Sequence, residues 1–300
     1  MCLIAFAIQA SSRWPLVIAA NRDEFVERPT TPLARWQTPS GATLISGRDL
    51  RAGGTWFGVT PGGRVAFLTN VREGEASPAP RSRGELVTRW LESQDDAGAF
   101  VAGLASESRH FGGFNLVLGD SARSHWTWMT NRWAHGAADQ ARHDVSHGAP
   151  WHQQSLAPGV YGLSNAALDS PWPKTTQLKS VLSQSLRLHE PGGNLQALQA
   201  DLWRALGNRE RASAHSLPHT GIAPAREEAL SSAFVEYPEY GYGTRNSTLL
   251  TATAHQTPGH ASFCDVIMEE REHLRGPSAP KEGERAAPWR VRRESLCWQA

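Results

Sequence analysis

Apolar residues gather in short runs near both ends of the chain and take a helical spacing in its middle. Residues 2–9 and 15–20 are almost continuously apolar, which is typical of strands that are buried on both faces. The polar residues 11–13 predict a turn between them, so we expect the two strands to pair as a hairpin. Residues 21–24, which follow the second strand, would then lie beside the start of the first.

Further strands and helices follow from the same patterns. Strands are predicted over residues 43–46, 55–60, 64–70, 114–119, 125–130, 160–164, 244–253 and 261–269. Helices are predicted over 82–107 with a break near 94–96, from Pro173 onward, and over 195–206. The prolines between Arg28 and Pro32 predict that this segment is irregular.

The order of these elements indicates the fold class. Strands come first, helices fill the middle and strands return, which favours an α+β protein with sheets layered against helices over a βαβ repeat. We expect a single domain over residues 1–274. Residues 275–300 are charged and rich in proline and glycine, so this tail is predicted to be disordered.

Composition narrows the classes of partner and the compartment. The 300 residues include 30 basic and 29 acidic ones, a balance that argues against a nucleic-acid or anionic-membrane partner. No apolar run reaches the ~18–20 residues of a membrane span, and the apolar start lacks the basic region of a signal peptide. Three widely spaced cysteines, Cys2, Cys264 and Cys297, do not suggest a disulfide framework. We therefore expect a cytoplasmic protein without integral membrane association.

Cys2 is the first candidate for chemistry, because its small side chain permits removal of Met1. The new terminus would carry a thiol and a free amine on one residue, and an amine with a pKa near ~8 can take the thiol proton. Attack of the thiol on a carbonyl would give an acyl-enzyme that water hydrolyses. The alternative is that Cys2 only begins a buried strand, as free cysteines often do.

Charged residues at the end of the second strand come next. If the first two strands pair, Arg22 or Asp23 lies within reach of Cys2. An aspartate can hold the α-ammonium group, and an arginine can lower the pKa of the thiol or bind an anionic group. The ordinary alternative for residues 21–24 is a charged surface turn.

Three further residues stand at strand ends or enter strands. Asn70 and Asn165 each close a predicted strand, where a side-chain amide can donate to a developing oxyanion. Asparagine also favours such positions for turn formation alone. Arg245 enters an apolar strand, where it could clamp a carboxylate or phosphate, or simply pair at an edge.

Other familiar sites are not supported by the sequence. It contains no nucleophile elbow of the Gly-x-Ser-x-Gly type, no phosphate-binding loop and no His-Glu-x-x-His motif. His143, His147 and His152 are close together, but the glycine and proline among them favour a loop. We therefore predict no metal site.

Seven motifs together resemble one protein family. They are MCLIAFA, AANRDEF, SGRDLRAGGTWFGVT, FLTNVRE, SRGELV, GLSNAALDSPWPK and YGTRNSTLL. In this order they resemble the NRDE family, also called the transport and Golgi organisation protein 2 family. The resemblance spans about residues 1–270 and leaves out only the tail.

The resemblance implies a fold and a set of roles. The family is similar to N-terminal-nucleophile hydrolases near the choloylglycine hydrolase and penicillin V acylase group, which implies an αββα sandwich of two antiparallel sheets between helical layers. It also implies that Cys2 is the nucleophile, assisted by Asp23, Asn70 and Asn165. Those acylases carry an arginine where this chain has Ala20, so Arg22 takes that place only approximately, and Arg245 is a candidate for their second arginine.

Two classes of function with a ligand remain open, beside a third alternative, a structural scaffold whose cleft has lost its function. The first is hydrolysis of an amide or thioester acyl bond by Cys2, which needs no cofactor. The second is a non-catalytic carrier or trafficking protein for haem, or for a lipid or other acyl ligand, on the same fold. Both imply a small acyl-containing or hydrophobic ligand, and the many Trp and His residues are compatible with the haem alternative without identifying an axial ligand.

The first prediction is that the mature protein begins at Cys2. Methionine is removed when the second residue is small, so intact mass spectrometry of protein from the native host should show the loss of one methionine. Complete retention of Met1 there would contradict a mechanism in which the amine of Cys2 takes part.

Overall fold

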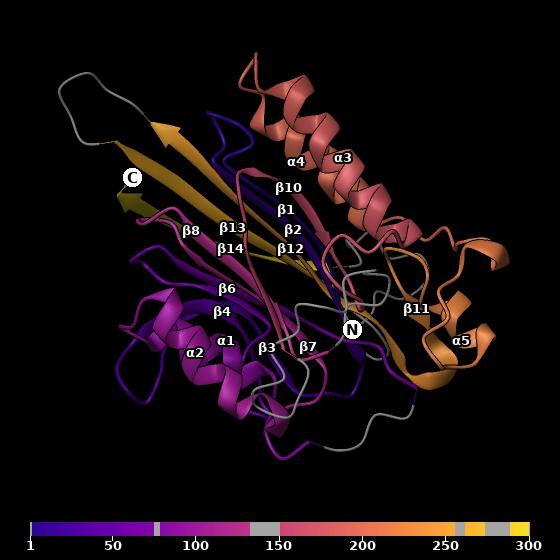
Figure 1. Ribbon diagram of the computed structural model, residues 1–300. Coiled ribbons are helices and arrows are strands. Elements are labelled where there is room, and N and C mark those ends of the chain that lie inside the picture. Colours follow the sequence, from indigo (N-terminus) through magenta and orange to yellow (C-terminus); the bar gives the residue numbers. More distant parts are fainter. Residues whose placement is uncertain (1, 75–78, 133–150, 256–261, 274–288, 300) are drawn as a thin grey trace.

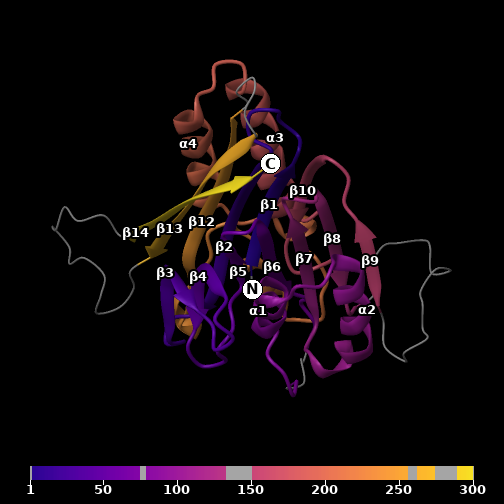
Figure 2. The same cartoon turned by 90° about the vertical axis from the view of Figure 1, so that its left-hand side faces the viewer.

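The computed structural model describes residues 2–74, 79–132, 151–255, 262–273 and 289–299. The strands form two antiparallel sheets. Sheet A contains, in spatial order, β10 (Gly159–Leu163), β1 (Cys2–Ile8), β2 (Leu16–Phe25), β12 (Tyr242–His255), β13 (Phe263–His273) and β14 (Trp289–Gln299), and β11 (Glu236–Tyr237) pairs with β12. Sheet B contains β3 (Thr30–Gln37), β4 (Thr43–Asp49), β5 (Phe57–Val59), β6 (Arg64–Asn70), β7 (Phe114–Asp120), β8 (His125–Thr130) and β9 (His152–Ser155). Figure 2 shows both orders across the molecule.

Four helices cover the outer faces of the sheets (Figure 1). They are α1 (Gly84–Glu92) and α2 (Ala97–Glu107) on sheet B, and α3 (Pro173–His189) and α4 (Leu195–Leu206) on sheet A. The described residues also contain the short helix α5 (Pro224–Ala229) and 3-10 turns at Ser108–His110, Ala214–Ser216 and Pro238–Tyr240. One apolar core lies between the sheets, a second between sheet B and helices α1 and α2, and a third between sheet A and helices α3 and α4. The predicted α+β fold with four αββα layers is therefore confirmed.

Strands β1 and β2 are the buried centre of sheet A. They pair antiparallel with Cys2 opposite Arg22, which confirms the predicted hairpin and puts Cys2 and Asp23 at the same end. Ile4, Phe6 and Ile8 face the core between the sheets, and the intervening residues face α3 and α4. Because both faces are covered, both faces must be apolar, which explains the unbroken runs in the sequence.

The segment around Pro32 was predicted to be irregular, and this prediction is wrong. Thr30 to Gln37 form β3, an edge strand of sheet B whose register with β4 shifts between Thr31 and Ala34. A bulge on an edge strand tolerates a proline, because that position needs no ladder donor. The neighbouring Leu33 N–H, turned from the ladder, donates to Glu270 Oε1 at 2.8 Å.

The predicted disorder of the tail is also wrong in part. Residues 289–299 form β14, which pairs along its whole length with β13, and Trp298 is buried between the sheets. The sequence of this segment is highly charged, but its backbone pairs with β13 and therefore forms a strand. Residues 275–288, like His143 and His147, lie outside the described residues, whereas His152 begins β9. Within the described part, no helix is both long and apolar enough for a membrane span.

Removal of an aromatic ring from the core between the sheets should destabilise the protein strongly. Phe67 is fully buried, and its ring lies 5.0 Å from that of Phe6 and 5.7 Å from that of Phe57. Phe67→Ala should lower the free energy of unfolding in urea by about 3–5 kcal/mol, because it leaves a cavity that the two sheets cannot close. Leu188→Ala, at a side chain that is 72% exposed, is the control and should change it by less than about 0.5 kcal/mol. Equal effects of the two substitutions would contradict the four-layer packing.

Candidate active site

A cavity of about 490 Å³ lies where β1 begins and β2 ends. Four of the six predicted site residues line it, namely Cys2, Arg22, Asp23 and Asn70. The other walls come from residues that the sequence did not single out, among them Glu24, Arg28, Asp49, Arg51, Trp56 and Arg83. The other two predicted residues, Asn165 and Arg245, do not line the cavity.

Cys2 is held rigidly in the cavity wall. It pairs with Arg22 across the sheet, and its carbonyl oxygen accepts a hydrogen bond of 3.1 Å from Ser164 Oγ at the end of β10. Only 8% of the residue is exposed. Burial raises the pKa of the Cys2 thiol. The N-terminal ammonium and the Arg22 cation oppose this rise, and the nearby Asp23 carboxylate adds to it. In the chain with Met1 attached, this environment favours the neutral thiol.

Arg22 faces the space between the sheets, on the same side of sheet A as Cys2. Its guanidinium carbon lies 4.2 Å from the centre of the Trp56 ring, and its Nη2 is 3.7 Å from Glu24 Oε2. Trp56 can lie here because position 47 is glycine, since a Cβ on Gly47 would come within 2.4 Å of the indole. The indole and the cation stabilise each other and fix a positive charge near the thiol.

Asp23 faces the other side of sheet A, toward α3, but it stands at the strand end and so still borders the cavity. Its Oδ1 accepts a hydrogen bond of 2.7 Å from Thr244 Oγ1, and its main-chain oxygen accepts one of 2.8 Å from the Tyr242 hydroxyl. Burial raises the pKa of the Asp23 carboxyl, and the charge of Lys174 opposes that rise. The charge of Lys174 thus favours the ionised form of Asp23 against the effect of burial.

Lys174 is a part of the site that was missed. It is 4% exposed in the first turn of α3, where the helix dipole disfavours a cation, and its Nζ donates to the Leu230 carbonyl at 2.8 Å. Burial lowers the pKa of Lys174 to about 8, and the Asp23 carboxylate opposes the decrease. Lys174 is the last residue of the motif GLSNAALDSPWPK, but no local pattern indicates that its side chain is buried.

Arg72 extends the same buried network. It forms an ion pair with Glu227 at the start of α5, and its guanidinium carbon lies 4.9 Å from the Trp172 ring. Burial lowers the pKa of Arg72, and Glu227 opposes this change. Arg72 follows Asn70 in FLTNVRE and was missed for the same reason as Lys174.

The two asparagines act on each other. Asn165 Nδ2 donates to the main-chain oxygen of Asn70 at 2.8 Å, and the Asn165 carbonyl accepts from the Arg72 N–H at 2.8 Å. One strand end of each sheet is thereby joined to the other at the cavity. Asn70 lines the cavity, whereas Asn165 lies outside its lining and binds the main chain of Asn70.

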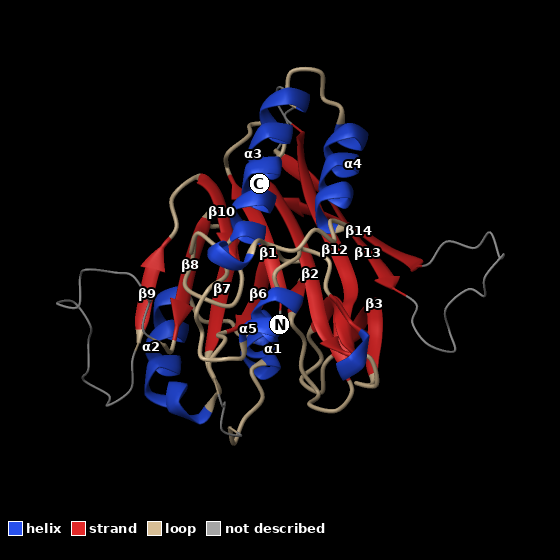
Figure 3. Ribbon diagram, turned by 90° about the vertical axis from the view of Figure 1, so that its right-hand side faces the viewer, coloured by secondary structure: helices blue, strands red, loops and turns tan. Residues whose placement is uncertain are grey.

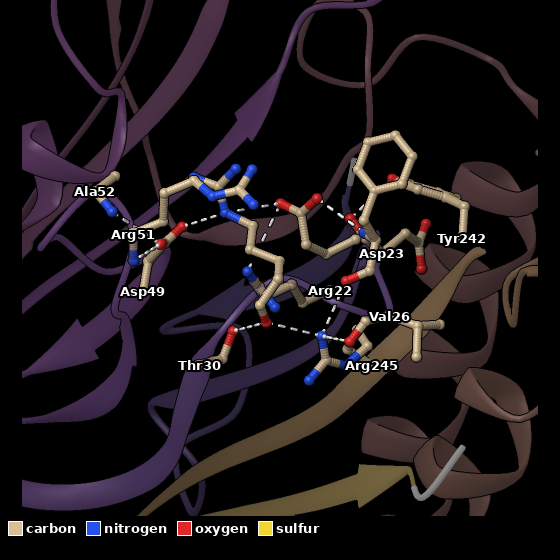
Figure 4. Close-up of polar contacts among 12 residues, drawn as sticks. Arg22, Asp23, Val26, Thr30, Asp49, Arg51, Ala52, Tyr242 and Arg245 are labelled. Carbon is tan, nitrogen blue, oxygen red and sulfur yellow. Dashed lines mark hydrogen bonds and ion pairs between the residues drawn. The ribbon is translucent and has the colours of Figure 1, made fainter. Parts of the chain in front are cut away.

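Arg245 is set apart from Cys2. It occupies the bulge in β12 between Thr244 and Asn246, and its Nη1 donates to the main-chain oxygens of Phe25, Val26 and Arg28 at 2.8–3.1 Å. Figure 4 shows it turned toward this loop. Arg28 in turn binds Asp49 at 2.7 Å, and Asp49 Oδ1 accepts from the backbone of Arg51 and Ala52. Arg245 therefore shapes the rim of the cavity through the loop after β2.

Glu270 lies between the sheets on β13, on the same face of sheet A as Arg22. It is 1% exposed and accepts the hydrogen bond from Leu33 of β3. Burial raises the pKa of Glu270 to about 7, while the Leu33 N–H and the Arg22 charge oppose the rise. Among the described residues, no group of three or more His, Cys, Asp or Glu side chains is arranged to hold a metal ion.

Comparison with known proteins identifies the family of this chain. A family model described as "Transport and Golgi organisation 2" matches residues 1–270. The mouse "Transport and Golgi organization 2 homolog" is 29% identical over 287 residues (92% of this chain, 96% of the relative), and the bovine homolog is 30% identical over 282 (89% and 93%). The fruit-fly protein of that name is 26% identical over 267 residues, covering 83% of this chain and 87% of the relative.

Two solved structures are similar in shape. One is the Caenorhabditis elegans ortholog of N-acylethanolamine-hydrolyzing acid amidase, with a TM-score of 0.44, 14% identity and coverage of 67% of this chain and 85% of that one. The other is the C2A mutant of conjugated bile acid hydrolase from Clostridium perfringens, with a TM-score of 0.44, 6% identity and coverage of 86% and 89%. At these scores nothing about the chemistry of this chain follows from either.

Glu270 should make the protein less stable as the pH rises from about 4.5 to 7. Its pKa is 4.5 in an unfolded chain and about 7 in the fold, so the folded state binds more protons between these values and loses stability as the proton leaves. This difference in pKa corresponds to roughly 3 kcal/mol in the free energy of unfolding.

Glu270→Gln keeps an acceptor for the Leu33 N–H and cannot ionise. The free energy of unfolding of this variant, minus that of the natural protein, should therefore grow by roughly 3 kcal/mol between pH 4.5 and pH 8, measured by urea unfolding. A difference that stays constant with pH would show that Glu270 does not titrate as its burial implies.

Proposed function

The chain belongs to the Transport and Golgi organisation 2 family, and we propose that within this family it is a hydrolase of an acyl bond with Cys2 as nucleophile. The observation that carries the proposal is the position of Cys2 in the cavity wall, opposite Arg22 and beside Asp23. Removal of Met1 would place the new α-amine at the start of β1, at the same end of the sheet as the Asp23 carboxylate.

In the proposed reaction the α-amine of Cys2 takes the proton of the thiol, directly or through a water molecule. The thiolate attacks the carbonyl carbon of an amide or thioester, and the amine returns the proton to the departing nitrogen or sulfur as its bond to carbon breaks. Water then attacks the acyl-cysteine, giving up a proton to the amine, and the carboxylic product leaves with the thiol restored. Atoms and charges balance without any cofactor.

The surrounding residues have distinct tasks in this proposal. Asp23, kept ionised by Lys174, holds the α-ammonium, and Arg22 stabilises the thiolate. Asn70 donates to the oxyanion, and Asn165 positions Asn70 through its main-chain oxygen. Arg245 orients the loop that carries Arg28, and so acts on the rim alone.

The size and lining of the cavity fit a small acyl-containing ligand. A volume of about 490 Å³ lies within the usual range for small-molecule sites, and its wall combines Trp56 with several arginines.

The thiols of Cys2 and Cys264 are free and buried, and that of Cys297 is free and exposed. This thiol chemistry supports a reducing compartment, for which we propose the cytoplasm.

The test compares two forms of the protein that differ at the N-terminus. One begins at Cys2 after proteolytic release, and the other carries a glutamate between Met1 and Cys2, which prevents methionine removal. An alkylating reagent at neutral pH should modify Cys2 at least about tenfold faster in the first form, because the free amine and Arg22 favour the thiolate there. The exposed Cys297 should react equally in both and serves as the internal control.

Activity assays with amide and thioester substrates complete the test. Cys2→Ala should abolish hydrolysis with little loss of thermal stability, and Cys2→Ser should retain a trace. If Cys2 reacts no faster than Cys297 in the processed form, and Cys2→Ala leaves hydrolysis unchanged, the assignment of the nucleophile is wrong and a carrier function takes its place.

A further inference from the structure

A second cavity, of about 430 Å³, lies on the opposite face of sheet A from the core between the sheets. Ser247 of β12 and Arg271 and His273 of β13 form its floor, and the C-terminal end of α4 contributes Trp203 and Arg204 to its lining. Figure 3 shows α4 on this outer side of sheet A. Aromatic side chains line it from three parts of the chain, namely Trp203, Phe234 and Trp289. None of its lining residues borders the cavity at Cys2.

Arg271 is the central feature of this second cavity. Its guanidinium carbon lies 4.0 Å from the Trp203 ring centre and 5.2 Å from that of Trp289, and its buried Nε has no hydrogen-bond partner. Among the described residues no carboxylate lies within 4.0 Å of its nitrogens, although the more distant Glu269 favours its charged form. Burial lowers the pKa of Arg271, but an arginine remains charged under all ordinary conditions.

The other two arginines of this cavity are already neutralised. Arg204 Nη1 lies 3.1 Å from Asp201 Oδ1, and Arg209 Nε lies 3.2 Å from Glu236 Oε2. The cavity therefore presents one positive charge without a carboxylate partner among the described residues. A single carboxylate matches this charge, whereas a phosphate dianion would exceed it.

Hydrogen bonds join this cavity to the strand that carries Arg22 and Asp23. Asn21 Nδ2 donates to the carbonyls of Leu206 and Ala233, both at 2.8 Å, which fixes its Oδ1 as an acceptor. Ser247 Oγ must then donate to Asn21 Oδ1, at 2.6 Å, and can only accept from His273 Nε2, at 2.8 Å. His273 therefore carries its proton on Nε2, and its ring is held at the cavity wall.

We propose that this second cavity is a binding site for a small carboxylate with a flat apolar body. The carboxylate pairs with Arg271, which the two indoles hold in place, and the aromatic side chains enclose the apolar part. The volume suits a ligand of two or three fused or linked rings at most. The proposal stands independently of the hydrolase function, because no residue of the catalytic cavity takes part.

The experiment uses 1-naphthoate as the probe and neutral 1-naphthamide, of nearly the same shape, as its matched control. Isothermal titration of the full chain should give saturable binding of naphthoate and at least about tenfold weaker binding of naphthamide, because only the anion pairs with Arg271. Arg271→Met keeps an apolar stem between the indoles and should remove this preference. Arg204→Met, which removes a cation already paired with Asp201, should leave it unchanged.

The outcomes separate clearly. Loss of the preference in Arg271→Met alone, with the melting temperature retained, supports the site. Equal binding of naphthoate and naphthamide to the natural protein, unchanged binding in Arg271→Met, or the absence of saturable binding up to millimolar concentration would each overturn it. If Arg271→Met proves unstable, Arg271→Lys, which keeps the charge but not the planar fork, should weaken naphthoate binding and leave naphthamide binding unaffected.

Discussion

Antiparallel pairing of β1 with β2 governs the positions of Cys2, Arg22 and Asp23 at the candidate site, because register decides which face of a sheet a side chain occupies. With Cys2 opposite Arg22, both side chains turn toward the space between the sheets, and Asp23 turns toward α3. A slip of one residue would exchange these faces. It would also place Ile4 and Phe6 against the helices and open the central core, so the packing of the whole sandwich enforces the geometry of the site.

Strand β2 serves two polar environments at once because both its faces are buried. Arg22 is stacked on Trp56 between the sheets, while Asn21 and Asp23 are bonded on the side of α3 and α4. Burying so many polar groups costs free energy unless each finds a partner. Ser247 meets this need for Asn21, and Thr244 and the charge of Lys174 meet it for Asp23. Asn21, Arg22 and Asp23 are thus buried and bonded within the sheet, and do not form the surface turn that their composition alone would favour.

The sequence predicted those parts of the molecule that depend on local pattern. Apolar runs at residues 2–9 and 15–20 indicated buried strands, and their pairing brought Cys2 and Asp23 together as expected. It did not predict contacts that depend on distant register. Lys174 and Arg72 are buried beside the carboxylates of Asp23 and Glu227, which come from distant parts of the chain. Strand β14 depends in the same way on its pairing with β13. Pro32, which has no main-chain N–H, fits in β3 because the bulge at this sheet edge requires no hydrogen-bond donor at that position.

The charges around Cys2 bear on the proposal that its own α-amine takes part in the reaction. Burial raises the pKa of both the thiol and the Asp23 carboxyl, and the N-terminal ammonium opposes both rises. The side-chain cations that also oppose them, Arg22 for the thiol and Lys174 for Asp23, lie on opposite faces of the sheet. Neither cation alone neutralises both groups. An α-ammonium at the start of β1 stands at the strand end, where the two faces meet, and can lower the pKa of the thiol and of Asp23 together. In the proposed mechanism, removal of Met1 would move the N-terminal charge onto Cys2 itself, where it acts on the thiol and on the Asp23 carboxyl from the same strand end.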